Sequence, residues 1–178
     1  MKTTFLTIAL ALATVFGASA HDLAGKMCST EIHSEIAGDK LRMVVDFADS
    51  DSCHVVLIDE QLRTEYGAQA VIVIIVKTPA HYSVDGDHLT VDFYTDQIVV
   101  DMNGHVVGDT DDRTREYCKR ALDHEIESAR DFLKRDYQLL LPQLSEMTIV
   151  GVTDDEVELT LDATPSRFPD MEGSRIRP

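Results

Sequence analysis

The spacing of apolar residues changes twice along this chain, and this change limits its possible folds more than any other feature. From Met27 to Val107, apolar residues alternate or form short blocks between turn residues, which is typical of β-strands. From Asp111 to Met147 they recur every three or four residues, the spacing of one face of a helix. Alternation by two returns from Thr148 to Asp162. The sequence therefore predicts strands, one long amphipathic helix, and a closing pair of strands.

The strongest strand signal is the apolar run from Ala70 to Val76. Most of its residues are β-branched, which favours the extended backbone. A run that is apolar at every position predicts a strand covered on both faces.

Turn residues divide the first part of the chain into further strands. Asp85-Gly86 lies between two alternating segments and predicts a tight hairpin. Asn103-Gly104 predicts a second hairpin, and the Ser50–Ser52 segment predicts a turn between two earlier strands. Such short connections favour an antiparallel meander that curls into a barrel or half-barrel. The predicted strands are 27–32, 41–47, 53–58, 70–78, 81–84, 87–93, 97–102, 105–107, 148–152 and 156–162.

One long helix is predicted within residues 110–147, inserted before the last strands. Asp111 and Asp112 favour its N-terminus, and Pro142 should end or kink it near Leu141. Its apolar stripe consists of Cys118, Leu122, Ile126, Ala129, Leu133, Tyr137, Leu141 and Leu144.

Residues 1–20 have the three parts of a secretory signal peptide. Lys2 gives a positive charge, residues 5–16 are mostly apolar, and Ala18-Ser19-Ala20 is a cleavable pattern of small residues. The chain is therefore expected to be secreted or periplasmic. Residues 21–163 are expected to form a single domain and residues 164–178 a flexible tail. No other stretch has the length of a membrane span, so we expect no integral membrane segment.

Acidic residues outnumber basic ones, with 32 Asp and Glu against 16 Lys and Arg. This balance argues against nucleic acid as a partner and against docking to anionic lipid, because both require basic surface. The charge favours cations or basic partners, but it is equally consistent with a solvated surface alone.

The chain has three cysteines, an odd number for an exported protein. Cys28 and Cys53 lie on the first and third predicted strands and form the most favourable disulfide pair. The alternative is that they are small buried apolar residues.

No pattern of a known catalytic or metal site is present. The sequence lacks a His-Glu-x-x-His motif, a Gly-x-Ser-x-Gly motif, an EF-hand loop and a Gly-rich phosphate loop. We therefore predict no catalytic residues, no metal site, no cofactor and no enzymatic activity.

Two segments resemble a known group of exported proteins. Leu23-Ala24-Gly25-Lys26 opens the first strand, and Tyr82 to Leu89 forms a hairpin. In this respect the chain resembles the lipocalin-like (calycin-type) β-barrel domains exported by bacteria, over residues 23–107 and 148–162. Met27 stands where those domains commonly have tryptophan. The resemblance implies a small apolar ligand in the barrel, and the candidate interior residues are Phe47, Leu57, Ile74, Leu89 and Phe93.

Three functions follow from these observations. The first is an exported, non-enzymatic lipocalin-like domain that binds a small apolar ligand or a protein partner. The second is a structural or protein-interaction module whose core is filled, with the helix or the acidic face meeting the partner. The third is an extracellular hydrolase of unrecognised type. The position of the helix distinguishes the first function from the second. If the interior residues and the helix stripe fill the barrel, no room is left for a ligand.

Overall fold

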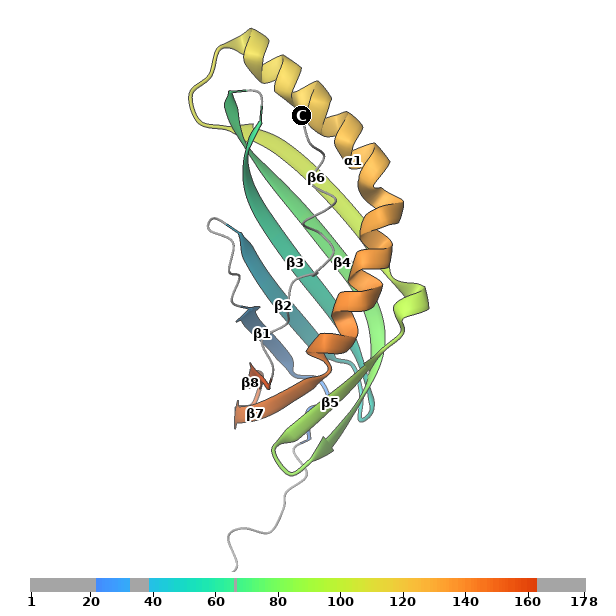
Figure 1. The fold of residues 1–178 in the computed structure, drawn as a ribbon. Helices are drawn as coiled ribbons and strands as arrows, with labels where there is room; N and C mark the ends of the chain where they lie inside the picture. Colours follow the sequence, from blue (N-terminus) through green and yellow to red (C-terminus); the bar gives the residue numbers. More distant parts are fainter. Residues whose placement is uncertain (1–21, 33–38, 66, 163–178) are drawn as a thin grey trace, which may run out of the picture.

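The computed structural model describes residues 22–32, 39–65 and 67–162, which form an antiparallel β-sheet curled into a nearly closed barrel with one long helix (Figure 1). The predicted signal peptide and the predicted tail lie outside the described residues. The strands are β1 (Met27–Ile32), β2 (Lys40–Phe47), β3 (Ser52–Glu65), β4 (Ala68–Asp85), β5 (His88–Phe93), β6 (Val99–Val107), β7 (Glu146–Val152) and β8 (Val157–Leu161).

Seven strands follow one another around the barrel in the order β1, β2, β3, β4, β5, β7, β8. Each is antiparallel to the next, so the first and last strands of an odd-numbered ring run parallel. They meet in a single parallel bridge between Met27 and Glu156, where Met27 N donates to Asp155 O at 3.2 Å. Lys26 Nζ also donates to Thr153 O and Asp154 O, each at 2.8 Å. Among the described residues, the Lys26 side chain and a few backbone bonds thus help to close the barrel at this seam.

Strand β4 carries the branch point of the sheet. Its first part pairs with β6 up to Lys77, and its last part pairs with β5 from Ala80. Pro79 lies between the two regions, where a residue without a backbone N–H interrupts neither of these two pairings. Because β4 continues through Pro79, the two strands predicted over 70–78 and 81–84 are one.

The helix α1 (Asp112–Leu140) lies along β6 and β4, as Figure 1 shows. Asp111 caps its N-terminus by accepting from the backbone N–H groups of Arg113 and Thr114. Pro142 lies in the short 3-10 helix η2 (Leu141–Leu144), which follows α1 directly. The end predicted near Leu141 is confirmed. No helix among the described residues is long and apolar enough to cross a membrane.

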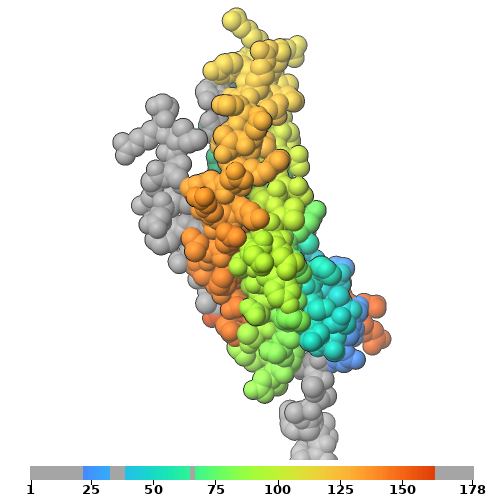
Figure 2. All heavy atoms as spheres, turned by 90° about the vertical axis from the view of Figure 1, so that its right-hand side faces the viewer, coloured from blue at the N-terminus to red at the C-terminus, as the bar shows by residue number. Residues whose placement is uncertain are grey.

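The inner face of the sheet and the predicted stripe of α1 form one hydrophobic core. Most of this stripe is buried, and Ile126 and Ala129 are partly buried against the core. Figure 2 shows the atoms of α1 packed closely beside the strands next to it in the view from the helix side. The interior of the barrel is therefore built from strand and helix residues together.

Two further predictions about the strands were wrong. Asn103-Gly104 is not a hairpin turn, because β6 runs unbroken from Val99 to Val107. A Cβ at position 104 would lie 3.1 Å from Ile126 Cδ1, so glycine here permits close approach of the helix. The run in β4 is also not buried equally on both faces. The side chains that point inward are buried, whereas Val71, Val73 and Ile75 on the other face are half-buried.

Candidate functional site

The inward-facing row of β3 changes from apolar to polar along the strand. Cys53, Val55 and Leu57 are buried in the core, and Asp59 continues the same alternation with only 5% exposure. Gln61 and Arg63 follow in phase and are half-buried. A buried carboxylate in an otherwise apolar row requires hydrogen bonds to offset its desolvation. This end of β3 is therefore a candidate functional site.

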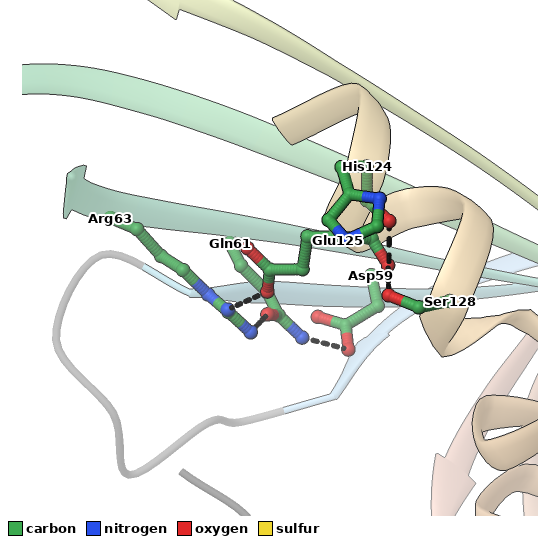
Figure 3. Close-up of polar contacts among 6 residues, drawn as sticks. All are labelled: Asp59, Gln61, Arg63, His124, Glu125 and Ser128. Carbon is green, nitrogen blue, oxygen red and sulfur yellow. Dashed lines mark hydrogen bonds and ion pairs between the residues drawn. The ribbon is translucent and has the colours of Figure 1, made fainter. Parts of the chain in front are cut away.

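Asp59 receives two hydrogen bonds on one oxygen. The Tyr137 hydroxyl of α1 donates to Asp59 Oδ2 at 2.9 Å. Gln61 Nε2 donates to the same atom at 3.0 Å, as Figure 3 shows. The Tyr137 hydroxyl bond joins residues 78 positions apart and is buried. It ties the inner face of the barrel to the final turns of the helix.

Arg63 extends the network toward the surface. Its Nη2 donates to Gln61 Oε1 at 2.6 Å, and its Nη1 lies 3.0 Å from Glu125 Oε1 on α1 (Figure 3). The Arg63 and Glu125 side chains are 38% and 29% exposed. We call Asp59, Gln61, Arg63, Glu125 and Tyr137 the β3–α1 cluster. Water partly screens this ion pair. It therefore orients the Arg63 and Glu125 side chains more than it stabilises the fold.

Asp136 is a further carboxylate on α1, and it precedes Tyr137 in the sequence. Its Oδ2 is buried and has no hydrogen-bond partner among the described residues. Burial raises the pKa of the Asp136 carboxyl group. An unsatisfied buried carboxylate oxygen is costly and is rare in folded proteins.

The other two residues drawn in Figure 3, His124 and Ser128, belong to α1. Ser128 Oγ donates to the carbonyl oxygens of His124 and Glu125 at 2.9 and 3.0 Å. No group of three His, Cys, Asp or Glu residues within the described ranges could hold a metal ion. The region therefore offers carboxylates, one arginine and amide groups, which can form ion pairs and hydrogen bonds with a partner.

A second polar cluster lies on β5, β7 and the residue after β8. His88 Nε2 is 2.6 Å from Glu146 Oε2, and His88 Nδ1 is 3.3 Å from Asp162 Oδ2. Thr90 and Thr148 donate to these two carboxylates. The His88 and Glu146 side chains are about half exposed, at 49% and 48%. The cluster links strands whose direct pairing is only three residues long, from His88 to Thr90, so it has a structural explanation.

The five residues predicted to line a ligand cavity all lie in the packed core. Their exposed fractions range from 0% to 7%, and they belong to the same core as the helix stripe: Phe47, Leu57, Ile74, Leu89 and Phe93. A hollow of about 420 Å³ lies elsewhere, where β5 meets the end of the helix. It is lined by Thr90, Val91, Asp92, Phe93, Pro142 and Ser145. Of the five predicted residues, only Phe93 borders it.

The cysteines Cys28, Cys53 and Cys118 are free and buried. Cys28 pairs with Val45 and Cys53 pairs with Phe47, so strand β2 separates them. Neighbouring strands lie about 4.8 Å apart, and a disulfide needs Cα atoms closer than about 7 Å. A Cys28–Cys53 bond would therefore require the backbone to move.

The β3–α1 cluster was not predicted from the sequence. The signal was available at Asp59, because an acidic residue falls in phase with the buried positions 53, 55 and 57. It was missed because the strand was predicted to end at Ile58. Comparison of the chain with models of protein families, with curated proteins and with solved structures found no match.

Proposed function

We propose that this chain is an exported, non-enzymatic module with lipocalin-like architecture that binds a basic segment of a protein partner. The binding region would be the β3–α1 cluster together with the adjacent face of α1. The observations that carry the proposal are the carboxylate of Glu125 beside Arg63 and, further along α1, the carboxylate of Asp136, whose buried Oδ2 has no hydrogen-bond partner among the described residues.

The packing of the barrel favours a protein partner over a small ligand inside it. The interior positions that would contact such a ligand are occupied by side chains of one continuous core, to which α1 contributes its stripe. Native cores are packed to a density that leaves little empty space. A protein partner would therefore bind to the outer surface of the barrel and helix.

The chemistry of the region favours a segment that combines basic and apolar side chains. Asp59, Glu125 and Asp136 supply three carboxylates, and Arg63 is the basic residue of the cluster. Phe132 and Leu139 on the same helix are 47% and 69% exposed. The net charge of −16 would also steer a basic partner toward the protein.

The test measures binding of a labelled peptide in which arginines flank a phenylalanine, with a glutamate-for-arginine peptide for comparison. We expect the basic peptide to bind more weakly as salt rises, and the acidic peptide not to bind. Glu125→Gln should weaken binding roughly tenfold, because it removes a negative charge that attracts the basic segment. The matched control is Glu127→Gln, which makes the same charge change on a different face of α1. Equal effects of the two variants would contradict the proposal.

The competing function is a small apolar ligand, which the resemblance to lipocalin-like barrels implies. Native mass spectrometry of the mature protein from its own host separates the two. A stoichiometric small molecule of defined mass would overturn the proposed function. We expect the spectrum of the protein alone, or of the protein with a basic partner chain.

The exported location rests on residues 1–20 and has its own test. N-terminal sequencing of the protein recovered from its host should begin at His21, after cleavage following Ala20. Recovery of a chain that still begins at Met1 would contradict export by this signal.

A further inference from the structure

Strand β6 is an edge strand of the sheet within the described part of the chain. It pairs with β4 along one side, and no other described strand pairs with it. The pairing with β4 is continuous from Val99 to Val107 and contains no bulge. Proteins usually protect an edge of this length with lysine, proline or a bulge, and β6 has none of these. In Figure 2, yellow-green atoms of β6 reach the surface beside α1, so this edge is open to another strand.

The backbone groups on the open edge belong to the even-numbered residues of β6. Tyr94 N donates to Pro79 O at 3.0 Å, so the odd-numbered residues of β4 turn their backbone groups toward β5 and β6. The register places each of these residues opposite an odd-numbered residue of β6. The even-numbered residues of β6 therefore point away from β4. The bond of 3.5 Å from Arg115 Nη1 to Val106 O agrees with this direction.

The side chains on the outer face of β6 form a row that is complementary to itself. The row consists of Val99, Asp101, Asn103, His105 and Val107. If a second copy of β6 pairs antiparallel about a two-fold axis at Asn103, Asp101 of each copy lies opposite His105 of the other. The aspartate can then accept a hydrogen bond from the histidine ring. At the two ends of the row, valine lies opposite valine.

The same axis also aligns the backbone groups of the two edges. It places even-numbered residues opposite even-numbered residues, so the groups on both edges meet as hydrogen-bonded pairs. All nine residues of β6 then have a partner. An axis one residue before or after Asn103 would leave two residues of each copy unpaired. Asp101 would then lie opposite Asn103 or Val107 and would lose His105 as its partner.

We propose that the protein forms a homodimer in which two β6 strands pair antiparallel about a two-fold axis at Asn103. The contact continues the sheet from one protomer into the next and uses the same residues on both sides. Each chain carries a net charge of −16, so the copies repel one another at a distance. Added salt should therefore strengthen the dimer, whereas it should weaken binding of the basic peptide. The dimer is independent of the proposed function.

Disulfide trapping of the full-length protein tests the register. Residue 103 lies on the axis, opposite its own copy in a non-hydrogen-bonded pair with Cα atoms about 4.5 Å apart. Asn103→Cys should therefore form a disulfide-linked dimer under mild oxidation, because a disulfide needs Cα atoms closer than about 7 Å. Val99→Cys is the matched control, at a side chain that is 54% exposed. Its two copies would lie about 27 Å apart along the strands, so it should link at least roughly tenfold more slowly.

Sedimentation velocity tests the contact between Asp101 and His105. His105→Asp should weaken the dimer roughly tenfold, because it places two carboxylates opposite each other at two points of the contact. His105→Lys should keep the dimer or tighten it, because it places opposite charges there. The controls are His54→Asp and His54→Lys, which make the same changes at an exposed position of β3. That strand is paired on both sides, so these two variants should change the dissociation constant little.

Three outcomes would overturn the dimer or its register. A protein that stays monomeric at about 100 μM, with and without added salt, would show that the edge does not pair with itself. Equal rates of disulfide linking at positions 103 and 99 would exclude the axis at Asn103. Equal effects of His105→Asp and His54→Asp would exclude the contact with Asp101. Urea unfolding checks that each variant is folded, and the two methods use different substitutions.

Discussion

At the scale of single residues, the buried pair of Asp59 and Tyr137 is the contact that most needs both partners. The carboxylate is 5% exposed, and its Oδ2 is satisfied by the tyrosine hydroxyl and by Gln61. Removing one partner from a buried charged group leaves its desolvation uncompensated.

Tyr137→Phe should therefore lower the free energy of unfolding by about 1–3 kcal/mol, because it removes one donor to a buried carboxylate. Urea denaturation at pH 7 measures the change. Tyr117→Phe, at a side chain that is 59% exposed, should change stability by less than about 0.5 kcal/mol. Equal losses in both variants would show that the Asp59 hydrogen bond contributes nothing specific.

The buried thiols give a prediction for chemical reactivity. Burial raises the pKa of Cys28 to about 11 and that of Cys53 to about 12, from a usual value of 9.0. Because the thiolate is the reactive form, neither cysteine should react with a thiol reagent in the native protein at pH 8. After denaturation without reductant, all three cysteines should react. Reaction of only Cys118 would show that Cys28 and Cys53 had formed the disulfide.

The same shifts predict how stability depends on pH. Below pH 9 these thiols are protonated in both states and do not oppose folding. Above pH 9 the unfolded chain loses their protons first, so stability falls as pH rises toward 11. Unfolding free energies measured at pH 8, 9 and 10 should decline less steeply in Cys53→Ala than in the native protein. Identical slopes would contradict the assignment to Cys53.

At the scale of elements, the contact between α1 and β6 depends on Gly104. A Cβ at this position would meet Ile126 Cδ1 at 3.1 Å and Leu122 Cβ at 3.7 Å. The helix stripe and the strand can therefore approach closely only where β6 has no side chain. This requirement explains an Asn-Gly pair in the middle of a strand, where the dipeptide ordinarily predicts a turn.

Gly104→Val should destabilise the protein by about 1–3 kcal/mol, because its branched side chain overpacks the contact with Ile126. Gly104→Ala should cost less, since the end of the Ile126 side chain can shift by a few tenths of an ångström. Shortening that side chain in the double variant Gly104→Val, Ile126→Val should recover part of the loss. Thermal unfolding measures all three, and a cost of Gly104→Val that Ile126→Val does not reduce would contradict this contact.

At the scale of the whole molecule, closure of the barrel depends on the seam between β1 and β8. The parallel meeting of these strands provides one bridge, and Lys26 Nζ bonds two carbonyl oxygens of the β7–β8 turn. Lys26→Met should destabilise the protein by about 1–2 kcal/mol and speed hydrogen exchange in β8. Lys40→Met, at the exposed start of β2, serves as the control. Unchanged exchange in β8 would show that the seam holds without Lys26.

Much of the fold could be predicted from the sequence because each element has a local cause. Alternation of apolar residues defines strands such as Met27–Ile32 at their exact bounds, and the turn at Asp85-Gly86 is confirmed by Gly86 at φ 62°. Asp111 caps the helix, and Pro142 follows its end, as the sequence indicates. These features depend on neighbours in the chain, so one sequence is sufficient to identify them.

The sequence by itself determined the antiparallel meander, the inserted helix and which side chains face inward. Only the tertiary structure decided that Gly104 extends a strand, that β4 exchanges β6 for β5 at Pro79, and that Asp59 meets Tyr137. The physical reason is that periodicity reports how each element presents its own faces to solvent. It does not report which distant element packs on a face, and that contact is what allows a glycine in a strand or a buried carboxylate at the end of a barrel.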